Sequence, residues 1–443
     1  MVESNIKIVE ELKEVFNIIN TDLEIKKKFT ESTTDFTRDR KLTFNRTVFL
    51  IINMLKRSLS IEIQDFFEKG IDSAISCTKV ALTIQRKKIK SSFFEVLNKQ
   101  FTKSFYHFYG DNVKKWRGFL VIAIDSSTAC LFNKESIITH FGCGNNQFTQ
   151  TPLARVLKYY DALNKFVIFS KICPISTGES TIVANHIEEL PENSLSIYDR
   201  GFAGFPLMYL LMNQEIERRF VIRCRTDFNR PVIAFMQSPS SDTVVDFYPD
   251  YKAKKKLYTY GYKAFSSTSI KIRMVKVVLK TGQIEVLLTN LYDTETYNTA
   301  CFKDLYSMRW GIETSYDTYK NKLQLEQFSG HSVCSIEQDF YATTFVSNLQ
   351  SIIEKQCEPY LKSISKNRKY EYQINKNVSI GNMKNKIVKL FLTQDPQTIL
   401  LHLQKLFEKS LEPIRPNRNL PRKVGGAKPK GKFITLTNYK RAI

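Results

Sequence analysis

The chain has 443 residues, of which 42% are hydrophobic and 12% aromatic, and this apolar content excludes a wholly disordered protein. Lys and Arg total 66 against 44 Asp and Glu, which gives a formal net charge of +22 and a pI near 9.5. An excess of this size is typical of proteins that bind a polyanion, most often nucleic acid, although a generically basic surface is the alternative.

The sequence indicates neither a membrane segment nor a metal site built on cysteine. The longest apolar run, Phe205–Met212, is far shorter than the ~20 residues that a bilayer requires, and the N-terminus lacks a signal-peptide pattern. The eight cysteines are scattered without a CxxC pair, which is typical of reduced thiols in a cytoplasmic protein. Any metal chemistry must therefore use carboxylates.

Residues 1–115 are predicted to be helical and basic. Thr43 is a candidate N-cap of a strongly apolar helix, and two further short helices follow. The last of these ends in the basic cluster Arg86, Lys87 and Lys88. This pattern favours a helix-turn-helix-like DNA-binding domain with the three cations as DNA contacts, and a plain helical bundle with a solvated basic face is the alternative.

From Gly118 onward the pattern becomes that of a mixed α/β sheet. The apolar run Phe119–Ile124 predicts a buried central strand, and this strand ends in Asp125. A second predicted strand, Leu195–Tyr198, ends in Asp199. Ligands collect where the strands of such sheets end, so both acids are candidate site residues, although aspartate is also a common turn residue.

The second half of the chain divides into three parts. Strands dominate residues 216–296, a helix is expected over Asn298–Leu325, and the stretch to residue 412 is predicted to be helical. Residues 413–443 contain no acid and include Arg422 and Lys423. This last segment is interpreted as a flexible basic arm that becomes ordered on DNA.

The predicted helix over Asn298–Leu325 carries a polar stripe. Its members are Tyr306, Arg309, Glu313 and Lys320. On a continuous α-helix the spacings of three, four and seven residues place them within an arc of roughly 60°. The alternative to a functional role is that these side chains only form the ion pairs common on the exposed side of an amphipathic helix.

A functional interpretation combines Glu313 with Asp125 and Asp199. Three carboxylates without histidine or thiolate favour Mg²⁺ or Mn²⁺. Two such ions activate a nucleophilic oxygen on one side of a phosphodiester and stabilise the leaving oxygen on the other. The guanidinium of Arg309 and the ammonium of Lys320 suit neighbouring phosphates, and Tyr306 suits a hydrogen bond to the DNA backbone.

The order Tyr306-x₂-Arg309-x₃-Glu313-x₆-Lys320 resembles the Tyr-Arg-Glu-Lys signature of bacterial cut-and-paste insertion-sequence transposases of the DDE class. The segment Asp199-Arg200-Gly201-Phe202 is similar to the block around the second acid of that family, and Ala123-Ile124-Asp125-Ser126-Ser127 to the block around its first acid. The resemblance covers about residues 38–350.

This resemblance implies an α/β protein with an RNase H-like mixed-sheet catalytic core, interrupted by a β-strand insertion and flanked by helical N-terminal and C-terminal regions. The expected segments are a DNA-binding domain at 1–115, the core at 116–215 and 297–345, the insertion at 216–296, a helical region at 346–412 and the arm at 413–443.

By the same resemblance, Asp125, Asp199 and Glu313 are the catalytic acids and the ligands of two Mg²⁺ (or Mn²⁺) ions. The implied enzyme is a DNA transposase that binds the terminal inverted repeats of its insertion sequence, excises the element by phosphodiester hydrolysis and joins its 3′ ends to target DNA. It would act on double-stranded DNA as a homodimer in the prokaryotic cytoplasm, with no membrane partner. The expected DNA contacts are Tyr306, Arg309, Lys320, Arg200, Trp310, Arg86, Lys87, Lys88, Arg422 and Lys423.

Two alternatives remain open at this point. The first is a domesticated relative that binds DNA without cutting it. Such a protein is expected to have lost one of the catalytic acids, whereas all three acids are present here. A stand-alone metal nuclease on the same fold would not need the long helical flanks.

Overall fold

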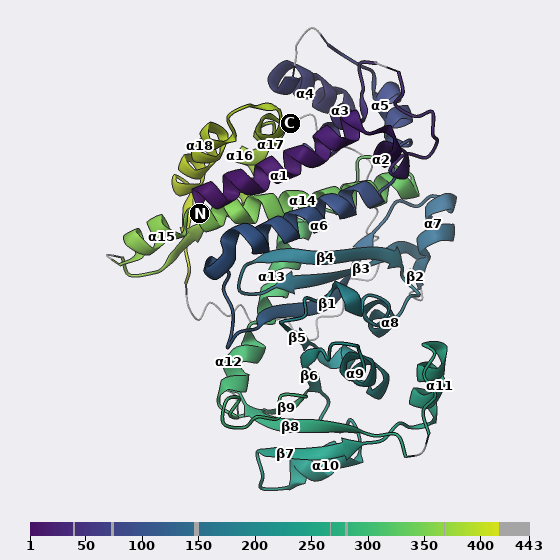
Figure 1. The fold of residues 1–443 in the computed structure, drawn as a ribbon, viewed down its shortest axis with the longest axis vertical. Coiled ribbons are helices and arrows are strands. Elements are labelled where there is room, and N and C mark those ends of the chain that lie inside the picture. Colours follow the sequence, from purple (N-terminus) through teal and green to yellow (C-terminus); the bar gives the residue numbers. More distant parts are fainter. Residues whose placement is uncertain are drawn as a thin grey trace. The chain divides into compact units, whose positions relative to one another are not determined.

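The computed structural model describes residues 1–38, 40–71, 75–145, 150–265, 267–279, 282–366 and 368–415 (Figure 1). The chain forms two compact units. We call residues 111–128 and 155–316 the sheet unit, and residues 1–110, 129–154 and 317–443 the helical unit. The boundaries of these units differ from those of the expected segments, because the N-terminal and C-terminal parts of the chain belong to the same unit.

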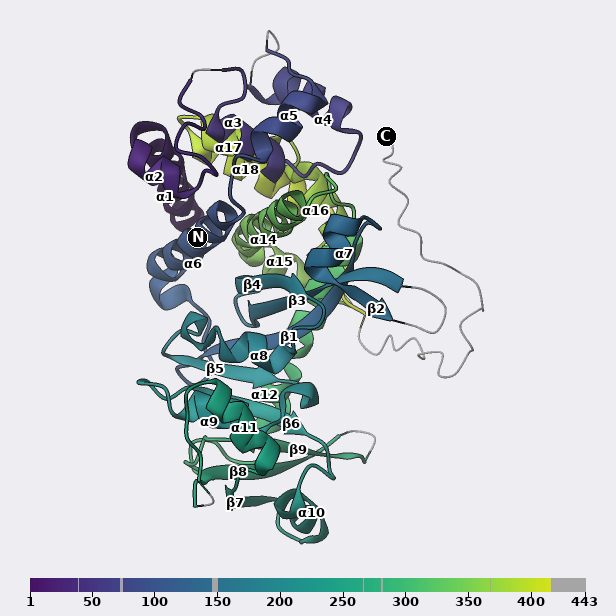
Figure 2. The same cartoon turned by 90° about the vertical axis from the view of Figure 1, so that its right-hand side faces the viewer.

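The helical unit is built around the long helix α14 (Val333–Gln356), most of which is buried. The helices packed against it come from both ends of the chain: α1 (Val2–Thr21), α3 (Phe44–Ile52), α6 (Ser92–Tyr109) and α18 (Pro396–Glu408). Figure 2 shows α14 among these helices. The helices expected to form a separate N-terminal domain therefore share one core with the C-terminal helices.

The N-terminal helices begin close to their predicted positions. Thr43 caps α3, because its hydroxyl accepts a hydrogen bond from the backbone N–H of Arg46. No helix in the described ranges combines the length and apolarity needed to cross a membrane. The unit also contains α2 (Leu23–Lys28), α4 (Leu59–Phe66), α5 (Lys79–Arg86), α7 (Glu135–Phe141), α15 (Glu358–Ser365), α16 (Lys376–Met383), α17 (Lys386–Leu392), π-helical turns at Phe67–Ile71 and Thr318–Lys322, and strands β2 (Cys143–Asn145), β10 (Tyr372–Ile374) and β11 (Leu411–Pro413).

The predicted mixed α/β architecture is confirmed in the sheet unit. The strands of its sheet are β1 (Leu120–Cys130), β3 (Gln150–Asp161), β4 (Phe166–Pro174), β5 (Ser194–Tyr198), β6 (Arg219–Cys224), β7 (Asp242–Phe247), β8 (Ile270–Val278) and β9 (Ile284–Thr289). Their order within the described residues is β3-β1-β5-β6-β9-β8-β7, and β4 pairs with β3. The three strands β1, β5 and β6 are parallel, and the strands from β6 to β7 are antiparallel.

The segment expected to be a β-rich insertion instead continues the central sheet, because β6 pairs with both β5 and β9. This segment also contains two helices that the strand-like pattern missed, α10 (Arg230–Gln237) and α11 (Tyr251–Thr259). Each has a capping residue: the carboxamide of Asn229 accepts from Val232 N–H, and the carboxylate of Asp250 accepts from Ala253 N–H. These caps were visible in the sequence.

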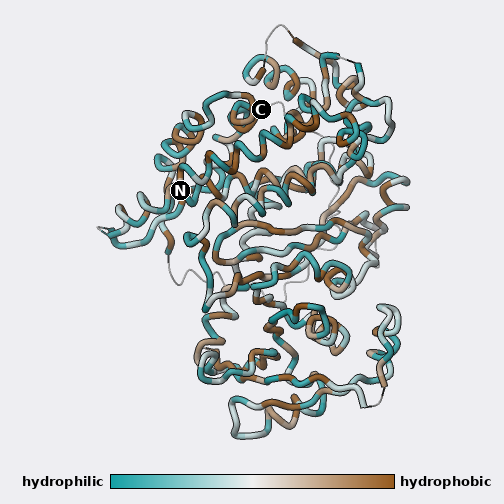
Figure 3. Tube along the Cα trace, viewed as in Figure 1, coloured by the Kyte–Doolittle hydropathy of each residue, from teal (hydrophilic) through white to brown (hydrophobic). Residues whose placement is uncertain are grey.

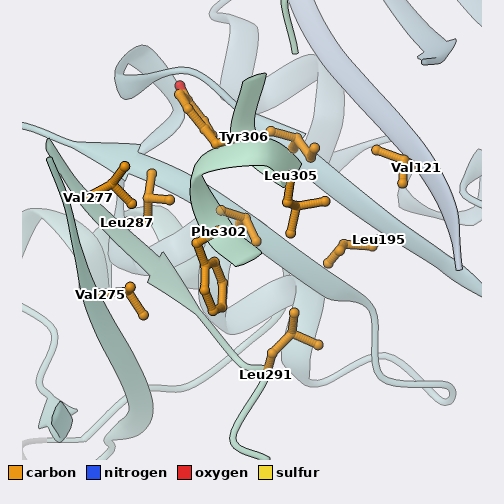
Figure 4. Close-up of a cluster of buried hydrophobic side chains, with 11 residues drawn as sticks. Val121, Leu195, Val275, Val277, Leu287, Leu291, Phe302, Leu305 and Tyr306 are labelled. Atoms are coloured by element: carbon orange, nitrogen blue, oxygen red, sulfur yellow. The ribbon is translucent and has the colours of Figure 1, made fainter. Parts of the chain in front are cut away.

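One face of the sheet is covered by α12 (Cys301–Ser307). Phe302, Leu305 and Tyr306 of α12 belong to one buried apolar cluster with strand residues such as Val121 and Leu195 (Figure 4). The other helices of the unit are α8 (Glu179–Ala184), α9 (Phe205–Met212) and α13 (Trp310–Asp317), with short 3₁₀ turns at Ile187–Glu189 and Arg200–Phe202. The apolar cluster fixes where α12, and the residues that follow it, meet the strand ends.

The prediction of one continuous helix over Asn298–Leu325 is wrong. The segment contains α12, then α13, and then the π-helical turn Thr318–Lys322. A break and a π turn both change the rotation per residue, so an arc calculated from α-helical geometry does not apply to all four stripe residues. Lys320 lies in the helical unit, whereas Glu313 lies in the sheet unit.

Candidate active site

Asp125 and Asp199 occupy equivalent positions on two adjacent parallel strands. The pairing of β1 with β5 runs in constant register to Ile124↔Tyr198, an offset of 74 residues (198 − 124). Asp125 is the next residue of β1, and Asp199 is the residue directly after β5. Because side chains alternate between faces, both point to the face that carries Val121 in the α12 cluster. The predicted end of the first strand needs correction, since β1 continues beyond Asp125 to Cys130.

Arg309 links the first aspartate to the predicted glutamate. Arg309 is buried, with 4% of the residue exposed. Its Nη1 lies 3.7 Å from Asp125 Oδ2, and its Nη2 donates to Glu313 Oε1 at 2.7 Å. Arg309 Nε is buried and has no hydrogen-bond partner among the described residues. A single guanidinium therefore spans two of the three candidate metal ligands.

The remaining aspartate is held by an arginine that the sequence analysis did not single out. Arg223 on β6 donates from Nε and Nη2 to Asp199 Oδ1 at 3.1 and 2.5 Å, and from Nη1 to Glu285 Oε1 at 2.5 Å. The pairing of β5 with β6 ends at Tyr198↔Ile222, so Arg223 is the next position beside Asp199. The polar residues thus form a row across three adjacent strands: Asp125, Asp199 and Arg223.

Tyr306 is buried, which corrects its predicted role as a DNA contact. Its hydroxyl donates to the carbonyl oxygen of Tyr198 at 3.4 Å. Its ring centroid lies 5.9 Å from the guanidinium carbon of Arg223 and 5.8 Å from that of Arg309. Tyr306 therefore positions, through cation–π contacts, the two arginines that bind the acids.

The two aspartates differ in pKa because their surroundings differ. Burial raises the pKa of Asp125 to about 6, and the neighbouring carboxylates of Asp199 and Glu179 also raise it, against the Ser126 N–H and Arg309. Burial also raises the pKa of Asp199, but the backbone N–H of Arg200 and the guanidinium of Arg223 outweigh it and leave the pKa below its ordinary value. The two neighbouring carboxyl groups therefore differ in pKa mainly because burial dominates at Asp125, whereas hydrogen bonds and the Arg223 charge dominate at Asp199.

The raised pKa of Asp125 gives a prediction for stability. The folded protein keeps the Asp125 proton up to about pH 6, whereas the unfolded chain releases it near 3.8, so the free energy of unfolding falls as pH rises across this window. We expect Asp125→Asn to remove this fall and to stabilise the protein by about 3 kcal/mol above pH 6. Urea unfolding from pH 4 to 8 measures the free energy of unfolding of both proteins. The same pH dependence in Asp125→Asn and in the wild type would contradict the raised pKa of Asp125.

A fourth carboxylate, Glu179 at the start of α8, was also missed. Its Oε1 accepts from Ser126 Oγ at 2.5 Å and from Arg155 Nη1 at 2.6 Å. The backbone N–H of Ser126 donates to Asp125 Oδ1 at 2.8 Å. Glu179 and Arg155 therefore fix the residue that holds Asp125. An acid in the first turn of a helix is commonplace, so the sequence alone did not distinguish Glu179.

Several of the predicted DNA contacts lie on the surface. Arg200 is exposed in the 3₁₀ turn after Asp199, and Trp310 is 55% exposed with its ring 5.5 Å from the guanidinium carbon of Arg309. Lys87 is exposed, and Lys88 Nζ lies 3.3 Å from Asp35 Oδ1. Arg422 and Lys423 lie outside the described residues.

Arg86 is buried, which corrects its predicted role in DNA binding. Its Nη2 pairs with Asp339 Oδ1 at 2.9 Å, and its Nε donates to Gln338 Oε1 at 2.9 Å. Nη1 donates to Ser329 Oγ at 2.5 Å, and Nη2 also donates to the carbonyl of Ser335 at 3.2 Å. Arg86 therefore ties α5 to α14 inside the helical unit and is not accessible to a phosphate.

The three predicted ligands have donor chemistry that fits a hard divalent cation, because Asp125, Asp199 and Glu313 offer only carboxylate oxygens. In the described part of the chain, no three carboxylate, imidazole or thiol groups are grouped closely enough to form a preassembled metal site. Arg309 instead provides the positive charge beside Asp125 and Glu313. A bound cation would take over that compensation.

Several chains among the solved structures show a distant likeness to this one. No family model and no curated protein matches the sequence. A solved structure of the piggyBac transposase synaptic complex with hairpin DNA is similar at 12% identity and a TM-score of 0.41, over 96% of this chain and 86% of that chain. We therefore infer the function from the residues of this chain.

Proposed function

We propose that this chain is a DDE-type, metal-dependent DNA transposase of the insertion-sequence kind, which excises its element by phosphodiester hydrolysis and joins the 3′ ends to target DNA. One observation carries the proposal. Arg309 contacts both Asp125 and Glu313, and Asp199 follows the strand that pairs with the strand of Asp125, although the three acids are far apart in the sequence.

The strand arrangement supports an RNase H-like core. The strands that carry the two aspartates are adjacent and parallel, β3 flanks β1 on the other side, and β6 continues the parallel set. The helix with the third acid, α13, follows the helix that covers this face of the sheet. A mixed sheet that carries acids side by side on its central parallel strands, where the pairing of those strands ends, is suited to hold a phosphodiester.

The roles of the site residues follow from their contacts. When bound, divalent cations would lower the pKa of an attacking water or 3′-hydroxyl and stabilise the leaving oxygen. Asp125, Asp199 and Glu313 would hold these ions. Arg309, once relieved of its pairing with Asp125 and Glu313, could bind a phosphate with its forked N–H groups, since Arg suits this geometry. Arg223 and Tyr306 keep Asp199 and Arg309 in position.

The partners in this proposal are double-stranded DNA at the element ends and at the target. The net charge of +22 supplies the sequence-independent attraction to phosphates. Exposed Arg200 and Trp310 stand beside the acids and would contact the DNA nearest the cut. We propose a homodimer on paired ends, since excision requires two ends to be held together.

The proposal predicts cutting at the ends of the DNA region that surrounds the coding sequence. We expect the purified chain with Mg²⁺ or Mn²⁺ to produce breaks at terminal inverted repeats in a labelled plasmid, and to release 3′-hydroxyl ends that join a second plasmid. Sequencing of the products measures both steps. Binding of the repeats without any strand cleavage would replace this proposal with the non-cutting alternative.

A further inference from the structure

A groove lined by lysines lies between α8 and α11 in the sheet unit. It has a volume of about 510 Å³. Both helices pack on α9, and Figure 2 shows α9 and α11 side by side. The residues that line the groove are Thr181, Asn185, Lys252, Lys255, Lys256, Thr259 and Tyr260. None of them belongs to the candidate active site.

The groove carries positive charge without an internal counter-ion. Lys252, Lys255 and Lys256 are spaced so that they share one side of α11, the side that lines the groove. Within the described residues, Lys252 and Lys255 form no ion pair or side-chain hydrogen bond, and Lys256 Nζ donates to the neutral hydroxyl of Thr181 at 3.1 Å. Three ammonium groups lining one groove favour an anionic ligand with several charges.

Two aromatic side chains stand on the outer surface of the same helix. Tyr251 and Tyr258 are 80% and 70% exposed, and Lys255 lies between them at i+4 from Tyr251 and i+3 before Tyr258. Buried Ala253 and Leu257 hold the opposite side of α11 against the protein. Figure 3 shows α11 as a largely hydrophilic helix. Exposed aromatic rings interleaved with lysines are the combination that binds nucleic acid strands with accessible bases.

We propose that the groove between α8 and α11 binds the phosphate backbone of a DNA strand with unpaired bases, and that Tyr251 and Tyr258 stack on those bases. The inference rests on the proposed function, because it takes DNA as the partner. The position fits a strand that leaves the candidate active site: α8 begins at Glu179, whose carboxylate binds the hydroxyl of Ser126 beside Asp125. Stacking requires open bases, since the bases of a duplex are already stacked on each other.

The lysines are tested by the salt dependence of binding. The variant Lys252→Ala/Lys255→Ala/Lys256→Ala is compared with Lys362→Ala/Lys366→Ala/Lys369→Ala, which removes the same charge from exposed positions in the helical unit. The probe is a labelled duplex with a single-stranded overhang. We expect the groove variant to flatten the slope of log K against log[salt] by about 2, because each lost single-strand phosphate contact removes roughly 0.7. Equal slopes in the two variants would overturn the proposal.

The tyrosines are tested by comparing overhang DNA with blunt duplex. We expect Tyr251→Ala/Tyr258→Ala to weaken binding of the overhang probe by about tenfold or more and to leave binding of the blunt duplex unchanged. Tyr251→Phe/Tyr258→Phe should keep the affinity, since phenylalanine also stacks. Tyr360→Ala, at a 41% exposed tyrosine of α15, is the control. An equal loss on both probes would exclude base stacking.

Two further outcomes separate the possible failures. If the wild-type chain binds neither DNA probe, the proposed function fails, and with it the groove assignment. If the wild type binds DNA but the groove variant loses only its binding to vesicles of anionic phospholipid, the groove serves a membrane surface and the inference alone is overturned. Circular dichroism of each variant verifies that it folds.

Discussion

Replacing any one of Asp125, Asp199 or Glu313 by its amide is expected to lower DNA cleavage by on the order of 10³-fold or more, with DNA binding retained. The amides preserve shape but remove the negative charge that a divalent cation requires. Retained binding follows because the basic surface, not the acids, attracts the phosphates. Cleavage of an end-labelled inverted-repeat substrate and fluorescence anisotropy measure the two properties separately.

The matched control is Asp227→Asn, which makes the same chemical change in an exposed ion pair with Arg225 in the same unit. We expect it to cleave at the wild-type rate. Any acid whose amide variant cleaves as well as this control does not belong to the active site. A loss shared by the control and all three variants would show only that the sheet unit is sensitive to charge.

Arg86→Ala is expected to destabilise the helical unit by about 3–5 kcal/mol, the range measured when one partner of a buried ion pair is removed. The arginine is buried and binds Asp339, Gln338, Ser329 and the backbone of Ser335. Its removal leaves the buried carboxylate of Asp339 without its counter-ion. Urea unfolding monitored by circular dichroism measures the change, and Lys87→Ala, at the exposed neighbouring position, is expected to change stability by less than about 0.5 kcal/mol.

The loss of stability in Arg86→Ala should depend on pH. Burial raises the pKa of Asp339, but the charges of Arg86 and Lys56 and the hydrogen bonds from Ser329 together outweigh burial, so the folded-state pKa lies below its ordinary value. The pair therefore contributes stability above the unfolded pKa, and this contribution disappears as the pH falls through the folded pKa. We expect the difference between the wild type and Arg86→Ala to shrink at acidic pH. A small and pH-independent difference would mean that the arginine is solvated in solution.

Local patterns in the sequence predicted many of the elements and the candidate acids. The runs Phe119–Ile124 and Leu195–Tyr198 identified β1 and β5, because a buried strand of a parallel sheet is continuously apolar. The Thr43 cap located α3. Charge pairing was the alternative left open for the polar stripe, and Arg309 and Glu313, one helical turn apart, do pair at 2.7 Å.

Contacts between segments that are far apart in the chain could not be predicted in this way. Arg86, Lys87 and Lys88 are equivalent cations in sequence, and only the packing of α5 on α14 buries the first of them. Arg223 and Glu179 look like ordinary strand and helix residues until pairing and folding bring them to Asp199 and Ser126. Strand pairing likewise placed β6 and β9 in the central sheet, although their local pattern is equally compatible with a separate insertion.

The amino-acid sequence by itself determined the basic charge, the buried strands and the spacing of residues along each helix, since these depend on composition and on local periodicity. Only the tertiary structure decided which charged side chains are buried and which acids share a counter-ion, because desolvation and ion pairing depend on neighbours from remote segments. The offset of 74 residues between β1 and β5 sets Asp125 beside Asp199, and this register is fixed by the packing of a whole strand and not by either aspartate.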